Sequence, residues 1–248
     1  FRKGAQFVHS LAHRAPSSIT PAGQPADGSP SPRYSRFVTL TLTLTLTPRA
    51  AQRGTNTMAR RKDHTREELT ELAVNCGRQL VIADGTGALT ARNVAKAIGY
   101  TPGTLYNLFD NIDGLAAAIN CVTLNEFAET IATIRAGRNT PTKQLEKICQ
   151  AYLKIQQEQP ALWTLLFATP ITIKSDTYGQ AIHNVFDQVV ETIRPLCSNK
   201  NTARQDAKII WSTLHGICLL QQNGKLNVTE SDSSEVLLKR FLNQFLNR

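Results

Sequence analysis

The chain has 248 residues, which is enough for one or two domains with a sizeable core. Its formal charge of +9 suggests a nucleic-acid partner, but residues 1–57 hold seven Lys or Arg and one Asp, so residues 58–248 carry only +3. DNA affinity in the larger part must therefore come from the local placement of basic groups. No run of about 18 apolar residues is present, so the sequence predicts no membrane-spanning helix.

Residues 1–57 differ in composition from the rest of the chain. Pro, Ser, Gly and Ala dominate residues 15–32, and a Thr/Leu repeat occupies residues 39–47. The single Met of the chain is Met58. We expect residues 1–57 to be a disordered leader, from upstream translation or an artefact, with the native start at Met58. A basic arm that adds non-specific DNA affinity is the alternative.

The first predicted helix follows the short basic arm Arg60, Arg61 and Lys62. Thr65 and Glu68 form the T-x-x-E pattern of a capping box, which predicts the helix start. Apolar residues then recur at helical spacing, and the segment ADGTGAL at residues 83–89 ends the helix.

Residues 90–113, TARNVAKAIGYTPGTLYNLFDNID, predict two short helices with one apolar face each. Gly99 between them can adopt the positive φ of a tight turn. Thr101 is expected to cap the second helix, and Pro102 suits its first position. The pattern predicts a helix-turn-helix, whose second helix usually enters the DNA major groove. An ordinary αα-hairpin is the alternative.

Polar residues at the starts of these helices are the candidate DNA contacts. Gly103 lets the second helix approach DNA closely, Asn107 suits an adenine edge, and Tyr106 can reach a phosphate or a thymine methyl group. Thr90 and Arg92 are expected to contact phosphates. The full predicted set is Arg60, Arg61, Lys62, Thr90, Arg92, Thr101, Gly103, Thr104, Tyr106 and Asn107.

The core Gly-Thr-Leu-Tyr-x-x-Phe at residues 103–109, with the following turn DNIDGL, resembles the recognition helix of TetR-family transcriptional regulators. The resemblance runs from about Thr65 to Leu115. It implies an all-helical homodimer with an N-terminal DNA-binding domain and a C-terminal domain for ligand binding and dimerisation. Leu108 and Ile112 depart from the family pattern, which often has a phosphate-contacting His or Tyr at the first position and a Lys at the second.

Further helices are expected at about residues 111–135, 142–157, 160–168, 175–194, 202–223 and 233–247, separated by helix-breaking residues. The segment PALWTLLFA at 160–168 is apolar all round and is expected to be buried. Asp232 and Glu235 are expected to cap the last helix. The piece WSTLHGIC at residues 211–218 resembles the Trp…His-Gly pattern of one C-terminal subtype in the TetR family.

The sequence therefore predicts an all-α chain, with a three-helix DNA-binding domain at residues 58–112 and a regulatory and dimerisation domain at 113–248. A ligand cavity is expected among the C-terminal aromatic residues, with ordinary core packing as the alternative. These residues are Phe127, Tyr152, Trp163, Phe167, Phe186 and Trp211. The dimer interface is expected on the last two helices, at Trp211, Leu214, Leu237, Phe241 and Phe245.

Motifs for catalysis or metal binding are lacking in the sequence. His215 and Cys218 form one His-x-x-Cys pair without a second pair, and neither a GxSxG motif nor a P-loop is present. Five Cys without a CxxC pair predict reduced thiols in a cytoplasmic protein. We expect a repressor, with no enzymatic activity or cofactor, that a small-molecule ligand releases from a palindromic operator. A helical protein–protein adaptor and a ligand-independent DNA-binding protein are the alternatives.

Overall fold

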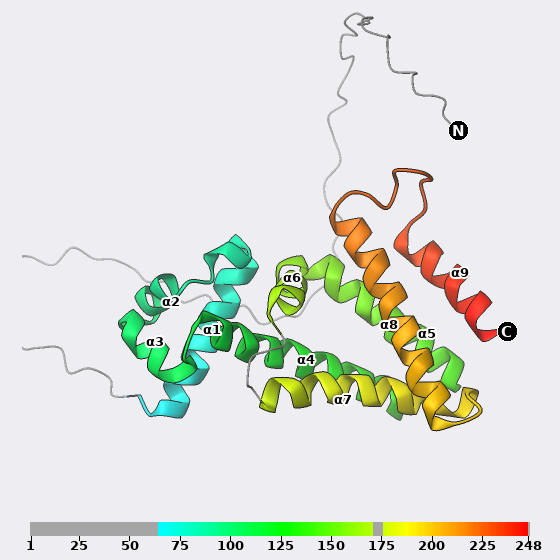
Figure 1. Ribbon diagram of the computed structural model, residues 1–248, viewed down its shortest axis with the longest axis horizontal. Coiled ribbons are helices and arrows are strands. Elements are labelled where there is room, and N and C mark those ends of the chain that lie inside the picture. Colours follow the sequence, from blue (N-terminus) through cyan, green and yellow to red (C-terminus); the bar gives the residue numbers. More distant parts are fainter. Residues whose placement is uncertain (1–63, 171–175, 248) are drawn as a thin grey trace, which may run out of the picture. The chain divides into compact units, whose positions relative to one another are not determined.

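The computed structural model describes residues 64–170 and 176–247. The predicted leader at residues 1–57 and the basic arm Arg60, Arg61 and Lys62 lie outside these ranges. Within them the regular elements are helices, as Figure 1 shows. The α-helices are α1 (Arg66–Asp84), α2 (Ala91–Ile98), α3 (Pro102–Phe109), α4 (Ile112–Ala136), α5 (Pro141–Glu158), α6 (Pro160–Ala168), α7 (Asp176–Ile193), α8 (Lys200–Gln222) and α9 (Ser234–Leu246). Short 3-10 turns span Thr86–Ala88 and Arg194–Leu196.

Local caps determine where α1 and α2 begin and end. The predicted capping box is present, since Thr65 Oγ1 accepts from the Glu68 N–H at 3.2 Å and Glu68 Oε2 accepts from the Thr65 N–H at 2.8 Å. Gly99 ends α2 with a φ of 77°, and the Tyr100 N–H donates to the Ala95 carbonyl at 2.8 Å. These bonds satisfy groups that a helix end would otherwise leave unpaired.

Two of the predicted caps are wrong. Thr101 precedes α3, but its hydroxyl contacts the Thr104 hydroxyl at 3.1 Å instead of a helix N–H. The Thr104 N–H, which a side-chain cap would accept from, donates instead to the Thr101 carbonyl at 3.0 Å. In α9 the cap is Ser233 rather than Asp232. Ser233 stands directly before the helix, from where its Oγ accepts from the Val236 N–H at 3.3 Å.

Only two residues, Asp110 and Asn111, join α3 to α4. Asp110 has φ 61° and ψ −48°, and the Asn111 N–H donates to the Phe109 carbonyl at 2.7 Å, which makes a γ-turn. A side chain held in such a conformation costs about 1–3 kcal/mol. Asn111 Oδ1 then accepts from the Gly114 N–H at 2.9 Å and starts α4. The direction of α3 is therefore tied closely to that of α4.

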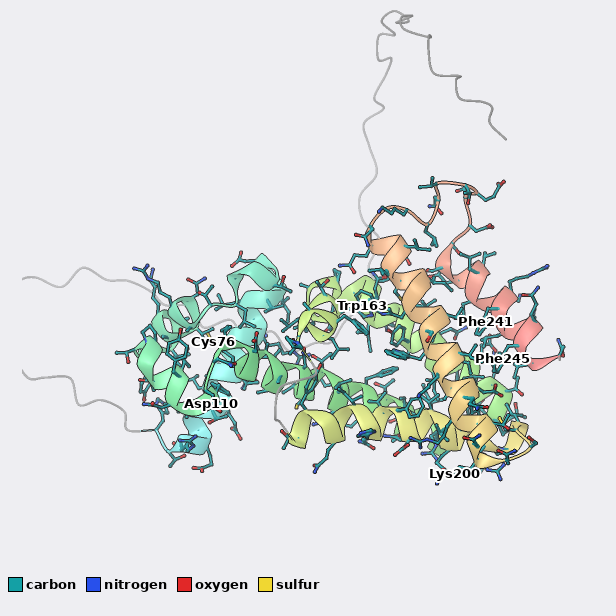
Figure 2. All side chains as sticks on the ribbon, in the orientation of Figure 1. Cys76, Asp110, Trp163, Lys200, Phe241 and Phe245 are labelled. Carbon is teal, nitrogen blue, oxygen red and sulfur yellow. The ribbon has the colours of Figure 1, made fainter. Side chains whose placement is uncertain are left out.

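Two large groups of buried side chains form the core. The N-terminal core joins side chains of α1–α4 with Leu162 and Leu165 of α6, and the C-terminal core joins side chains of α5–α9, including Trp163. Figure 2 shows Trp163 on α6 close to α8. Helix α6 therefore contributes to both cores. The prediction that α6 is buried on all sides is wrong in part, since Phe167 is 37% exposed.

Asn120 of α4 holds the C-terminal end of α6. Its side chain is fully buried, and Nδ2 donates to Thr169 Oγ1 at 2.9 Å and to the Leu165 carbonyl at 3.3 Å. Nδ2 also lies 3.5 Å from the Tyr178 hydroxyl of α7. A buried polar group that loses its partners costs about 1–3 kcal/mol, so these bonds fix α6 against α4.

Candidate nucleic-acid interface

The side of α3 that faces away from the N-terminal core carries the predicted base contacts. Leu105 is 3% exposed, and Leu108 and Phe109 are half-buried against that core. On the other side Asn107 is exposed and Tyr106 is 50% exposed. The helix thus presents polar side chains to solvent and apolar side chains to the protein, as a groove-reading helix requires.

Gly103 leaves the first turn of α3 open. A Cβ at this position would meet only Thr101 Oγ1, at 3.7 Å, which is an ordinary van der Waals distance. Thr104 is half-buried and its hydroxyl is engaged with that of Thr101. Another surface can therefore approach the backbone of α3 closely at Gly103.

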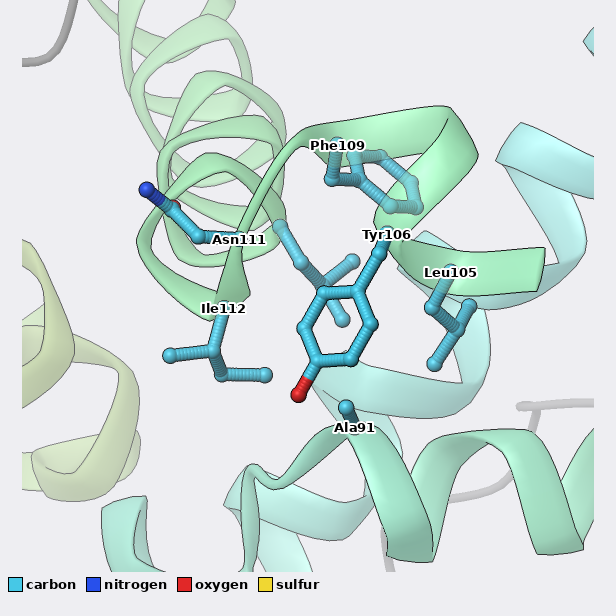
Figure 3. Close-up of a pocket in the computed structure, with 7 residues that line it drawn as sticks. Ala91, Leu105, Tyr106, Phe109, Asn111 and Ile112 are labelled. Carbon is cyan, nitrogen blue, oxygen red and sulfur yellow. The ribbon is translucent and has the colours of Figure 1, made fainter. Parts of the chain in front are cut away.

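Tyr106 lies over a shallow depression between the starts of α2 and α4. The depression is lined by Ala91, Leu105, Tyr106, Phe109, Asn111, Ile112 and Leu115 and is too shallow to enclose a water molecule. Figure 3 shows the Tyr106 ring extending toward Ala91 and Ile112, the first residues of α2 and α4. Since helix N-termini carry partial positive charge, the Tyr106 hydroxyl lies where an anionic group would be stabilised.

The start of α4 was not among the predicted contacts. The sequence indicates this helix start through Asn111, because Asn is a residue type favoured directly before a helix and the apolar Ile112 follows it. Ile112 itself is half-buried against the N-terminal core. The N-terminus of α4 thus supplies partial positive charge at a position where the Ile112 side chain carries no charge.

Helix α2 carries one hydroxyl and one cation at its start, and a second cation in its last turn. Thr90 Oγ1 accepts from the Asn93 N–H at 3.1 Å, which leaves its hydroxyl hydrogen able to donate to a phosphate. Arg92 is exposed and forms no ion pair within the described part of the chain. Lys96 is exposed in the same way and was not predicted as a contact, although its spacing of four residues places it beside Arg92.

Two long-range contacts connect the start of α1 with the helix-turn-helix. Arg66 Nη2 donates to the Asn107 carbonyl at 3.1 Å, and His64 Nδ1 lies 2.7 Å from the Tyr100 hydroxyl. The partners are 41 and 36 residues apart, so no local sequence pattern indicates them. The Arg66 bond leaves the Asn107 side chain exposed.

The six aromatic residues predicted to line a cavity are divided among different contacts. Phe127 packs edge-to-face on Tyr152, with 6.1 Å between ring centroids. Phe186 lies under the Arg204 guanidinium at 5.1 Å.

The other three aromatic residues, Trp163, Phe167 and Trp211, surround His215. Besides the depression at Tyr106, the structure describes an open cleft of about 220 Å³ between α8 and α9. Neither of these two spaces, among the described residues, is lined by any of the six aromatic residues.

The residues predicted for dimerisation differ in accessibility. Leu214 is 4% exposed inside the C-terminal core, and Leu237, Phe241 and Phe245 pack half-buried against it. Trp211 is 48% exposed. The accessible apolar side chains of α8 outside the predicted set are Ile209, Leu219 and Leu220, each about half exposed.

The five thiols are free, and those in the core are held neutral by burial. Burial raises the pKa of the Cys149 and Cys218 thiols to about 12. In residues 64–170 and 176–247, no group of three or more His, Cys, Asp or Glu side chains is placed to hold a metal ion. Over the same residues, no helix is long and apolar enough to cross a bilayer.

Comparison with known families covers both parts of the described chain. Residues 75–119 match the family described as bacterial regulatory proteins, tetR family, and residues 145–245 match the tetracyclin repressor-like C-terminal domain. The chain belongs to the TetR family. Its membership confirms the predicted resemblance, whereas the Trp…His-Gly subtype stays a prediction.

Individual relatives agree with this assignment. A Mycobacterium tuberculosis protein described as an uncharacterized HTH-type transcriptional regulator is 23% identical over 186 residues, which are 75% of this chain and 83% of that protein. A Streptomyces coelicolor A3(2) structure, described as a possible TetR family transcriptional regulator, has a TM-score of 0.58 at 15% identity over 72% of this chain and 97% of its own.

A third relative is a crystal structure of Thermus thermophilus FadR, a TetR family transcriptional repressor in complex with lauroyl-CoA. It has a TM-score of 0.56 at 15% identity and covers 71% of this chain and 93% of its own. These structural similarities confirm the predicted all-α fold, with a helix-turn-helix domain followed by a helical C-terminal domain. The family matches make this TetR-family chain a DNA-binding transcriptional regulator.

Proposed function

We propose that this TetR-family regulator is a homodimeric repressor that reads a palindromic operator with α3 and leaves it when a small molecule binds among the C-terminal helices. The exposed start of α3, with Gly103, Tyr106 and Asn107 directed away from the core, is the observation that carries the proposal. A twofold dimer would place its two α3 helices in successive major grooves. The predicted division into residues 58–112 and 113–248 is part of this proposal. The free thiols support a cytoplasmic location.

Phosphate contacts would come from groups around the base-reading residues. The Tyr106 hydroxyl lies near the starts of α2 and α4, and Thr90 and Arg92 stand exposed at the start of α2. These groups would position the protein on the duplex, whereas Asn107 would read an adenine edge.

Asn107→Ala is expected to relax base preference at one position of each half-site and to cost about 1–3 kcal/mol of operator binding. The Arg66 bond goes to the main chain of Asn107, so it does not depend on the side chain that is removed. Operators would be selected from a random DNA library and titrated by fluorescence anisotropy at about 50–200 mM salt. An unchanged ratio of operator to random-sequence affinity would count against base reading by Asn107.

Arg92→Ala is the matched comparison. Loss of a phosphate contact should lower affinity for all sequences alike and reduce the slope of log K against log salt by about one per protomer. The two variants therefore separate the two kinds of contact in one titration series.

We propose a dimer interface on the outward side of α8, which the accessible residues there support. Ile209, Ser212, Gly216 and Leu219 follow one another at spacings of three and four residues, so they share one face of the helix. Ser212 and Gly216 are small, and a Cβ at Gly216 would meet nothing within 4 Å. A second copy of α8 could therefore approach this face closely. Charges at Leu237 or Phe241 would instead disturb the C-terminal core of each subunit.

The double variant Ile209→Glu with Leu219→Glu is expected to be a folded monomer in sedimentation equilibrium and to bind the operator at least about tenfold more weakly, because two half-sites are no longer held together. Ile82→Glu is the control, since Ile82 on α1 is an isoleucine of the same 47% exposure as Ile209. A double variant that still sediments as the wild-type dimer would place the interface elsewhere.

Release by a small molecule draws support from the C-terminal aromatic residues. It also draws support from the relative FadR, whose structure contains lauroyl-CoA. The mutual packing of those aromatic residues favours a second candidate function, a DNA-binding regulator without a small-molecule effector.

A further inference from the structure

The carbonyl group of Asn107 lacks the partner that a regular helix would give it. In a continuing α-helix this carbonyl would accept from the N–H of the residue four positions on, which is Asn111. The Asn111 N–H donates instead to the Phe109 carbonyl at 2.7 Å, because the chain makes the γ-turn there. The turn that joins α3 to α4 thus leaves an acceptor without its helical partner at the C-terminal end of α3.

Arg66 of α1 supplies a replacement partner for this carbonyl. Its Nη2 donates to the Asn107 carbonyl oxygen at 3.1 Å. The partial negative charge at the C-terminal end of a helix also favours a cation at that position. Among residues 64–170 and 176–247, no carboxylate forms an ion pair with the Arg66 guanidinium. Arg66 therefore acts as a C-terminal cap of α3 that comes from another helix.

The start of α1 also makes a contact next to the other end of α3. His64 Nδ1 lies 2.7 Å from the hydroxyl of Tyr100, which stands two residues before Pro102, the first residue of α3. The two rings are 5.9 Å apart between centroids and tilted by 54°. His64 and Arg66 are only two positions apart, so one short segment contacts the chain at both ends of α3. These two contacts fix the rotation of α3 relative to α1.

We infer that Arg66 is a positioning residue for base reading, because its bond fixes the main chain from which the Asn107 side chain reaches a base edge. The inference rests on the proposed function, since it concerns the same helix and the same base contact. A hydrogen bond to a base requires a donor–acceptor distance of about 2.7–3.2 Å, so a displacement of α3 by about 1 Å breaks it. The Arg66 bond goes to the Asn107 main chain and leaves the side chain exposed for DNA.

The experiment is a double-mutant cycle between Arg66→Ala and Asn107→Ala, with operator and random-sequence DNA titrated by fluorescence anisotropy. Arg66→Ala alone should reduce the ratio of operator to random-sequence affinity about tenfold, within the roughly 5- to 150-fold expected from loss of the Asn107 contact. The salt dependence should stay that of the wild type, since no phosphate contact is lost. In the Asn107→Ala background, Arg66→Ala should reduce the ratio by less than about twofold, because the side chain that Arg66 positions is gone.

Arg92→Ala is the matched control for this cycle. Arg92 is another exposed arginine of the helix-turn-helix that forms no ion pair within the described part of the chain. Its loss should lower affinity for all sequences and should add to the effect of Asn107→Ala without coupling. Operators selected by Arg66→Ala should relax base preference at the same half-site position as those selected by Asn107→Ala. Arg66 is exposed, so its variant is expected to fold, and circular dichroism would verify the helix content.

Three results would each overturn the inference. They are an unchanged affinity ratio in Arg66→Ala, effects of Arg66→Ala and Asn107→Ala that simply add, and a uniform loss of affinity with a weaker salt dependence, which would make Arg66 a phosphate contact. Any of these, together with a wild type that distinguishes operator from random DNA, would remove the role of Arg66 alone. A wild type that does not distinguish the two DNAs would remove the proposed function itself.

Discussion

Gly114→Ala is expected to lower the free energy of unfolding by about 3 kcal/mol, at the upper end of the cost of overpacking. A Cβ on Gly114 would overlap the carbonyl oxygen of Phe109, the last residue of α3, and this oxygen accepts the hydrogen bond that closes the γ-turn between α3 and α4. The turn would have to open, and the orientation of α3 would be lost with it. Thermal unfolding followed by circular dichroism should show a Tm about 6–12 °C lower.

Gly179→Ala is the matched control for this prediction. Gly179 lies in α7, and a Cβ there would meet nothing within 4 Å. The control should be neutral or more stable by up to about 1 kcal/mol, because Gly is disfavoured inside a helix. If Gly114→Ala unfolds at the same temperature as the wild type, the close approach of α4 to Phe109 does not exist in solution.

Gly103→Gln should have opposite effects on folding and on DNA binding. An added Cβ meets only the Thr101 hydroxyl oxygen in the free protein, and the position is exposed, so stability should stay equal or rise slightly. On the operator it would hold α3 away from the groove and remove base contacts worth about 3 kcal/mol or more in total. Operator affinity should therefore fall by at least about hundredfold in anisotropy titrations, with a Tm that is unchanged or slightly higher.

The same substitution at Gly179, which is also an unobstructed helical glycine, should leave operator affinity unchanged. Tight operator binding by Gly103→Gln would mean that α3 does not enter the groove. A helix other than α3 would then have to carry the base contacts.

The helices could be predicted from sequence because their limits depend on neighbouring residues. The segment expected at 160–168 is α6 itself, and the other C-terminal helices differ from prediction by at most two residues at either end. The capping box at Thr65 and the left-handed Gly99 are likewise local features, and both are present. Such signals act within one helical turn, so the rest of the fold hardly alters them.

Features that depend on distant partners could not be predicted. The Arg66 bond to Asn107 and the position of His215 among rings of α6 depend on which helices pack together. The γ-turn at Asp110 is imposed on a residue that does not favour it, so the sequence gives no sign of it. The accessible α8 face at Ile209 also depends on which side the core covers.

The short connection between α3 and α4 also has a mechanical consequence. With its 25 residues, α4 is about 37 Å long, and α3 is attached rigidly to its first turn. A tilt of about 5° around the far end of such a lever moves its tip by roughly 3 Å, close to the rise of one base pair, about 3.4 Å. A small rotation inside the C-terminal helices could therefore put a half-site out of register by a whole base pair. The turn at Asp110 would convert a change of angle into a change of sequence register.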